Sequence, residues 1–162
     1  MDHFREIAAA FACPGTYLGE VPYGSGHIND TFRVCYDAGD RETHYIHQRV
    51  NHDIFRDVSK LMENIGRVTR HQRKKLEASG AGDLNRRVLT LIPTVDGRDF
   101  YRDSTGKYWR TYACIENAVG FDVIESTDQV CAAARAFGEV QCQPADLPER
   151  LHETIPGFHN TR

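Results

Sequence analysis

The residues best suited to chemistry lie in a short glycine-rich stretch, residues 22–34, with the sequence PYGSGHINDTFRV. Gly24 and Gly26 flank Ser25, and His27 follows them. Closely spaced glycines allow successive backbone N–H groups to turn toward one anion, which is how several loops bind phosphate. Asn29 is close enough to add a side-chain contact. Glycines at this spacing also occur in plain β-turns, where they supply a positive φ, so the surrounding elements decide between the two interpretations.

Three classes of phosphate-binding loop differ in the elements that come after their glycines. A P-loop requires Gly-x-x-x-x-Gly-Lys-Ser/Thr, and no such run occurs in the chain. A dinucleotide-binding loop leads from a strand into a helix, whereas these glycines lead into an alternating segment, TFRVCYD. The third class is a strand–turn–strand flap over ATP, followed by a strand with a phosphate-contacting cation and a helix with its carboxylate partner. The predicted order of elements fits the third class.

The residues around the loop predict one helix and three strands. Apolar side chains at helical spacing predict a helix over residues 3–13, with Asp2 as its N-cap and a stop at Pro14. Two short strands on either side of the glycines form a hairpin, because residues 31–36 alternate in polarity. A turn then leads to a third strand at residues 43–50, THYIHQRV.

A long amphipathic helix is predicted over residues 57–78, and it ends at Gly80. One face carries its apolar stripe and one glutamine: Val58, Leu61, Met62, Ile65, Val68, Gln72 and Leu76. The apolar run at residues 86–93 then predicts a buried strand. Residues 100–103 and 107–115 predict two more strands, separated by the turn Ser-Thr-Gly.

A final helix begins at a capping-box pattern, Ser126 with Gln129 three residues later. We expect five of its side chains to face inward: Val130, Ala133, Ala134, Phe137 and Val140. The complete order is helix, three strands, long helix, two or three strands, helix. Strands that come in blocks joined by turns pair antiparallel, so the sequence predicts an α+β fold with a mainly antiparallel sheet.

Composition and charge argue against several classes of function. The net charge of −3 and a pI near 6.2 give no general reason to expect nucleic-acid binding. The basic run at residues 67–75 lacks interleaved aromatic residues, so it is predicted to be a solvated helix face. Five scattered cysteines predict free thiols in a reducing compartment. Because neither a membrane span nor a signal-peptide pattern is found, we expect a cytoplasmic protein.

Three histidines, His44, His47 and His52, lie close enough in sequence to suggest a metal site. On a strand, His44 and His47 point to opposite faces, and no cysteine pair accompanies them. We therefore expect ordinary surface or core histidines there, and no metal site.

Six segments in order resemble the N-terminal half of aminoglycoside-phosphotransferase-like kinases, a superfamily that includes choline kinase. They are GSGHINDTFRV, YIHQRVNHDIF, LMENIGRVT, VLTLIPT, YWRTYACIEN and AFGEVQ. The resemblance is to the N-acetylhexosamine 1-kinase branch, and it runs over essentially all 162 residues. It implies a kinase-like nucleotide-binding N-terminal lobe at residues 1–117, then the hinge and the first helix of the C-terminal lobe at residues 118–162. It also implies ATP with Mg²⁺ and an amino-sugar acceptor.

The resemblance assigns nucleotide-binding roles to the flap, a strand and a helix. The flap comprises Gly24, Ser25, Gly26 and His27, with Asn29 beside it. The family's strand lysine is absent, and Gln48 and Arg49 stand in its place, pointing to opposite faces. Ile46 shares the face of Gln48 and suits the adenine side. Glu63, in the long helix, takes the place of the carboxylate partner, although it could equally be an exposed helix glutamate.

The resemblance places the hinge in the segment YACIEN, after the last strand. There the backbone of Cys114, Ile115 and Glu116 would hydrogen-bond the adenine edge, while Ile115 or Tyr112 packs on the ring. Tyr112 could instead be an ordinary core residue.

Family members also carry a histidine-any-aspartate loop that supplies the catalytic base, and a later aspartate that binds Mg²⁺. Nothing after Phe121 supplies either. We therefore expect no catalytic residue in this chain and no phosphoryl transfer by the chain alone. We also expect the helix around Phe137 to drive self-association. The alternatives are a non-catalytic, pseudokinase-like nucleotide-binding or interaction module, favoured by the missing lysine, or a kinase for an aminoglycoside, choline or homoserine.

Overall fold

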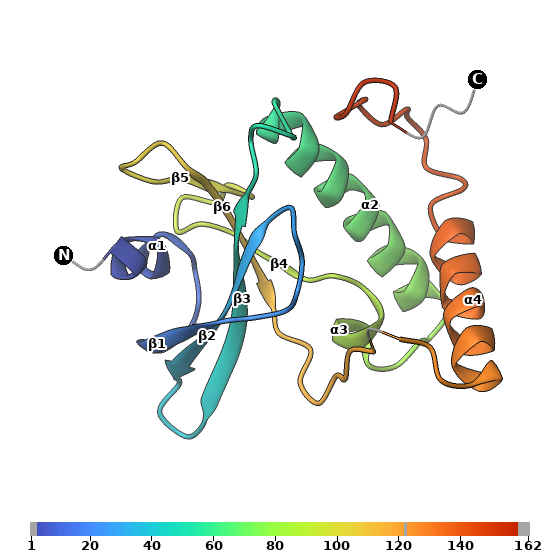
Figure 1. The fold of residues 1–162 in the computed structure, drawn as a ribbon, viewed down its shortest axis with the longest axis horizontal. Helices are drawn as coiled ribbons and strands as arrows, with labels where there is room; N and C mark the ends of the chain where they lie inside the picture. Colours follow the sequence, from blue (N-terminus) through green and yellow to red (C-terminus); the bar gives the residue numbers. More distant parts are fainter. Residues whose placement is uncertain (1–2, 122, 159–162) are drawn as a thin grey trace.

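The computed structural model describes residues 3–121 and 123–158, and they form an α+β fold (Figure 1). A six-stranded antiparallel sheet has the order β1-β2-β3-β6-β4, with β5 also paired to β6. Its strands are β1 (Thr16–Pro22), β2 (Asp30–Asp37), β3 (Glu42–Val50), β4 (Leu91–Ile92), β5 (Tyr101–Arg102) and β6 (Tyr108–Ala113). The helices of the described residues are α1 (His3–Ala10), α2 (Val58–Ala78), α3 (Leu84–Arg87) and α4 (Thr127–Cys142). The predicted class and the mainly antiparallel sheet are confirmed.

Helix α1 covers one face of the sheet. Ile7 and Phe11 are buried against Trp109 of β6, and Phe32 of β2 packs on the same cluster. The period-2 alternation of β2 explains this, because every second side chain meets the helix. The predicted helix was too long at its C-terminal end: Phe11 forms a β-bridge with Thr94, which ends the helical hydrogen bonding at residue 10. Its predicted N-cap, Asp2, lies outside the described residues.

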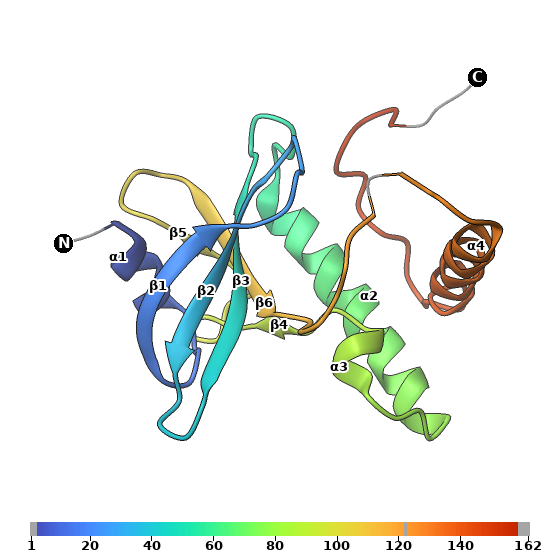
Figure 2. The same cartoon turned by 60° about the horizontal axis from the view of Figure 1, so that its bottom comes forward.

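Helix α2 packs on the opposite face, near the C-terminal end of β3. Val58 and Met62 form a buried cluster with Val50. The predicted start and end of this helix are confirmed: the Asp57 side chain caps its N-terminus by accepting from the amide of Lys60, and the helix ends at Ala78. The sheet therefore lies between α1 and α2, as both ribbon views show (Figures 1 and 2).

Two expectations about the second half of the chain differ from the structure. The strand predicted over residues 86–93 is reduced to Leu91–Ile92, because α3 takes up the residues before it, with the amide of Val88 bonding the carbonyl of Leu84. The capping box of α4 is present. No residue of this helix is buried, however, so the side chains expected to face inward do not, and Phe137 is 72% exposed. Amphipathic spacing predicts a face that is able to pack, not the surface it packs against. In both ribbon views α4 lies beyond α2, on the side away from the sheet (Figure 2).

Three basic residues of α2, Arg67, His71 and Lys75, have partners in the segment after α4. Arg67 donates to the carbonyls of Glu149 and Arg150, and Lys75 and His71 each approach Asp146 at 2.8 Å. These bonds fix the segment after α4 along α2. No helix of the described residues is both long and apolar enough to span a bilayer.

Candidate functional site

The sheet face opposite α1 carries two adjacent cross-strand pairs that differ in chemistry. Ile46 of β3 pairs with Tyr112 of β6, and two residues further along β3, Gln48 pairs with Arg110. Side chains two residues apart on a strand share a face and lie roughly 7 Å apart along it. The next pair, Val50 with Tyr108, belongs to the cluster beneath α2. An apolar pair and a polar pair thus lie side by side on this face, and α2 covers the sheet beyond the polar pair.

A mainly apolar cavity of about 170 Å³ opens beside the Ile46–Tyr112 pair. Its walls include Tyr23, Ile46, Leu89, Tyr112, Ala113 and Ile115. Sites that enclose a drug-sized ligand hold roughly 300–1,000 Å³, so this cavity suits one planar ring, with the rest of a larger ligand lying along the open sheet face. It lies where β6 leaves the sheet, and Tyr23 brings the glycine loop to its rim.

The segment after β6 is anchored by side chains from three elements. The carboxylate of Glu116 accepts from Arg33 of β2 at 3.1 Å and lies 2.8 Å from Nδ1 of His44 of β3. The backbone carbonyl of Glu116 accepts a hydrogen bond from Arg86 of α3. Within the described part of the chain, the amide of Ile115 has no hydrogen-bond partner. This amide, on a residue that lines the cavity, is available to the edge of a ring.

The glycine loop connects β1 and β2, as predicted. Gly24 has φ +81°, a conformation that side chains other than glycine rarely adopt, and the amide of Tyr23 closes the base of the loop on the carbonyl of Thr31. Ser25, Gly26 and His27 are exposed, and a Cβ atom at Gly26 would meet open space. The loop therefore has room to approach a ligand. Its neighbour Asn29 is used differently: its side-chain oxygen accepts from the amide of Asn51 and ties the loop to the end of β3.

Of the two candidates for the missing lysine, Gln48 faces the site and Arg49 does not. Arg49 forms an ion pair with Asp30 on the other side of the sheet. Gln48 donates to the hydroxyl of Thr31 at 2.8 Å, and its carbonyl oxygen accepts from both Nε and Nη2 of Arg110 at 2.9 and 2.6 Å. The cation beside Gln48 on this face is therefore Arg110, a residue that the sequence motifs did not single out.

Arg110 is half-buried, and desolvation lowers the pKa of its guanidinium from the ordinary value. The sequence did hold one signal for Arg110. It lies two residues before Tyr112, so both side chains lie on one face of β6. The remaining candidate, Glu63, is exposed on α2, and its ion pair is with His152 at 3.0 Å. In the described parts of the chain, no ion pair joins Glu63 to a cation of the sheet.

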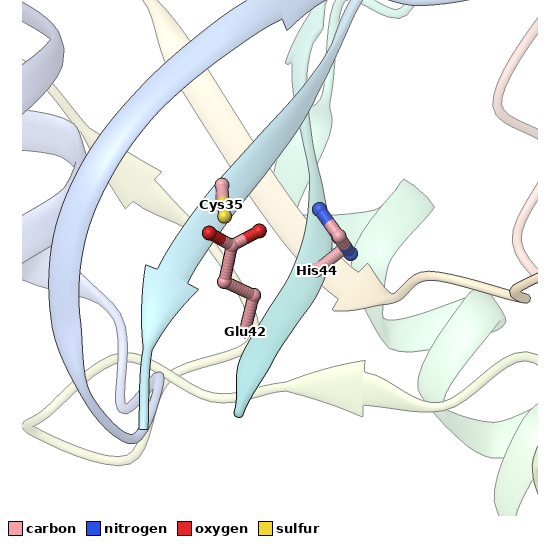
Figure 3. Close-up of side chains that lie close together, drawn as sticks. All are labelled: Cys35, Glu42 and His44. Carbon is pink, nitrogen blue, oxygen red and sulfur yellow. The ribbon is translucent and has the colours of Figure 1, made fainter. Parts of the chain in front are cut away.

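A second constellation on the same face combines Cys35 of β2 with Glu42 and His44 of β3 (Figure 3). One donor atom from each lies within 4.8 Å of the others, a set that borderline metals such as zinc accept. Two features oppose a metal here. Burial and the Glu42 carboxylate raise the pKa of the Cys35 thiol, which disfavours the thiolate. The Arg33 guanidinium also lies 3.2 Å from Nδ1 of His44.

The predicted orientation of His44 and His47 toward opposite faces is confirmed: His47 is fully buried on the α1 side, bonded to Tyr36 and Thr111. No known protein-family model matches the chain. Its function must therefore be inferred from the geometry of the site.

Proposed function

We propose that residues up to 117 form the nucleotide-binding lobe of an ATP-dependent phosphotransferase that resembles the aminoglycoside-phosphotransferase-like kinases. The segment after them leads into a second lobe, and the acceptor is a small molecule with an alcohol group, an N-acetylhexosamine in this proposal. In this view the described residues bind the nucleotide, and the catalytic base belongs to the second lobe.

The observation that carries the proposal is the neighbourhood of the apolar cavity and the polar pair on one sheet face. A purine ring needs a flat apolar slot with a hydrogen-bonding backbone at its edge, which the walls around Ile46 and Tyr112 and the amide of Ile115 offer. The phosphates need cations and backbone N–H groups, which Arg110 and the loop at residues 24–27 offer. The distance along the strands between the ring cavity and Arg110 suits a nucleotide that lies across β3 and β6.

The described residues of this face do not fit a Mg²⁺ site. Mg²⁺ prefers free carboxylate oxygens, and the carboxylate of Glu116 is already bonded to Arg33 and His44. Glu42 belongs to the cluster with Cys35. Any Mg²⁺ that accompanies ATP is therefore assigned to residues of the second lobe.

Filling the cavity tests the nucleotide part of the proposal. Ala118 lines the cavity from an exposed loop position, so Ala118→Trp should block the ring slot with little effect on folding. Ala38→Trp, in the exposed β2–β3 turn, is the matched control. By calorimetry we expect Ala118→Trp to weaken adenosine and ATP binding at least about tenfold and Ala38→Trp to change both by less than about twofold. Equal affinities in the two variants, or no binding by the unmodified chain, would contradict the proposal.

The acceptor is tested separately, on the full-length gene product. We expect ADP release from ATP to rise when N-acetylglucosamine or N-acetylgalactosamine is added. A response to an aminoglycoside, choline or homoserine instead would keep the kinase and change the acceptor. A protein that binds ATP but releases no ADP with any of them would favour the non-catalytic module, whose basis is Gln48 in the place of the lysine.

A further inference from the structure

Arg110 is a half-buried cation without an anionic partner. Its Nε and Nη2 atoms both donate to the neutral side-chain oxygen of Gln48. Within residues 3–121 and 123–158, no carboxylate lies within ion-pair distance of its guanidinium, and Nη1 has no hydrogen-bond partner. A guanidinium has five N–H donors, so one acceptor leaves most of its capacity unused.

Each of the other arginines of the sheet has a carboxylate or an aromatic ring as partner, although Nε of Arg33 is buried without a hydrogen-bond partner. Arg33 pairs with Glu116 and Arg49 with Asp30, while Arg102 is exposed over the ring of Tyr108. Removing a charge from water is costly unless an opposite charge compensates for it. A neutral side chain could hold Gln48 without that cost. The retained charge therefore points to an anion that comes from outside the described chain.

The position of Arg110 indicates which anion. It lies one cross-strand pair beyond the ring cavity, and its partner Gln48 is bonded to Thr31 of β2, the strand that follows the glycine loop. A group bound there is separated from the ring by about the length of a ribose. An arginine fork also matches phosphate oxygens in geometry.

We propose that Arg110 binds the phosphates of a nucleoside di- or triphosphate, in the role that other kinases give to a strand lysine, and that Gln48 positions its guanidinium. This inference rests on the proposed function, because it places the nucleoside in the adjacent cavity. Gln48 acts through Arg110 and offers its own amide to the same phosphates only secondarily, since that amide is already bonded to Thr31.

The test compares ligands with and without phosphate. Arg110→Met removes the charge, and Arg49→Met is the matched control, since Arg49 belongs to the paired strand but faces Asp30. By calorimetry at constant ionic strength, we expect Arg110→Met to weaken ATP and ADP binding at least about thirtyfold and adenosine binding less than about twofold. Arg49→Met should leave all three within about twofold. Gln48→Met should weaken ATP binding by an intermediate factor and leave adenosine unchanged.

The outcomes distinguish a failure of the inference from a failure of the proposed function. If ATP binds Arg110→Met as tightly as it binds Arg49→Met, the Arg110 inference is wrong and the nucleotide site stands. If the unmodified chain binds neither adenosine nor ATP, the proposed function is wrong and the inference falls with it. If Arg110→Met does not fold, a nuclear magnetic resonance titration of the unmodified chain tests the inference instead. The Nε–H resonance of Arg110 should shift with ATP and with pyrophosphate and stay in place with adenosine; no shift with either phosphate would overturn the inference.

Discussion

The buried histidine of β3 leads to a quantitative prediction about acid stability. His47 is fully buried between the hydroxyl of Tyr36, 3.0 Å from Nε2, and that of Thr111, close to Nδ1. Burial lowers its pKa from the ordinary 6.5 to about 4. Below about pH 6.5 the unfolded chain therefore binds a proton that the folded chain does not bind until about pH 4. The contribution of His47 to the free energy of unfolding should therefore decrease as the pH is lowered from about 6.5 to about 4, and it should change little below that.

The magnitude follows from linkage. Between pH 7 and pH 5, a group with these two pKa values reduces the free energy of unfolding by about 2 kcal/mol. Urea unfolding at both pH values measures it, with His47→Gln as the comparison, because glutamine keeps polar atoms near Tyr36 and Thr111 and does not titrate. All other titrating groups are common to the two proteins. The original chain should lose about 2 kcal/mol more than the variant, a difference of about 1 M in urea midpoint. Equal losses would refute the assignment of a neutral buried histidine.

Three further predictions concern a buried carboxylate, the loop and α4. Burial raises the pKa of Asp103, but bonds from Trp109, Thr105 and Lys107 outweigh it and lower the pKa to about 2. Asp103→Asn should therefore cost about 2–3 kcal/mol in urea unfolding, while Asp40→Asn in an exposed turn changes little. Gly26→Val should leave stability unchanged, because its Cβ meets open space, yet weaken ATP binding; unchanged affinity would make the loop a plain turn. The exposed face of α4 should associate at micromolar concentration and Phe137→Ser should weaken this, whereas a monodisperse monomer in light scattering would contradict it.

The sequence predicted the features that depend on nearby residues. The start of α2 just after Asp57, the hairpin around the glycines and the capping box of Ser126 and Gln129 all follow from local periodicity and side-chain-to-backbone bonds. It overextended α1, because the bridge that ends the helix joins Phe11 to a residue far along the chain. Features that depend on distant contacts were outside its reach.

In the candidate site, too, the sequence predicted what depends on nearby residues and missed what depends on distant contacts. The loop could be found from the spacing of its glycines, but the cation could not, because Gln48 and Arg110 meet through the β3–β6 register. The anchoring of Glu116 by Arg33 and His44 likewise joins residues far apart in the chain. A single sequence does not specify strand order, so the sequence offered candidates for the lysine that the resemblance implies on β3 alone.

The position of the charge, rather than the strand that carries it, should then decide phosphate binding. Gln48 and Arg110 are direct cross-strand partners, so exchanging their chemistry moves the cation to the neighbouring strand and leaves it on the same face. Gln48→Lys alone places two cations side by side and should destabilise the sheet, while Arg110→Gln alone should lose ATP affinity. In the double variant we expect ATP affinity within about fivefold of the original. A double variant that binds as weakly as Arg110→Gln would show that the arginine fork, and not the charge alone, is required on β6.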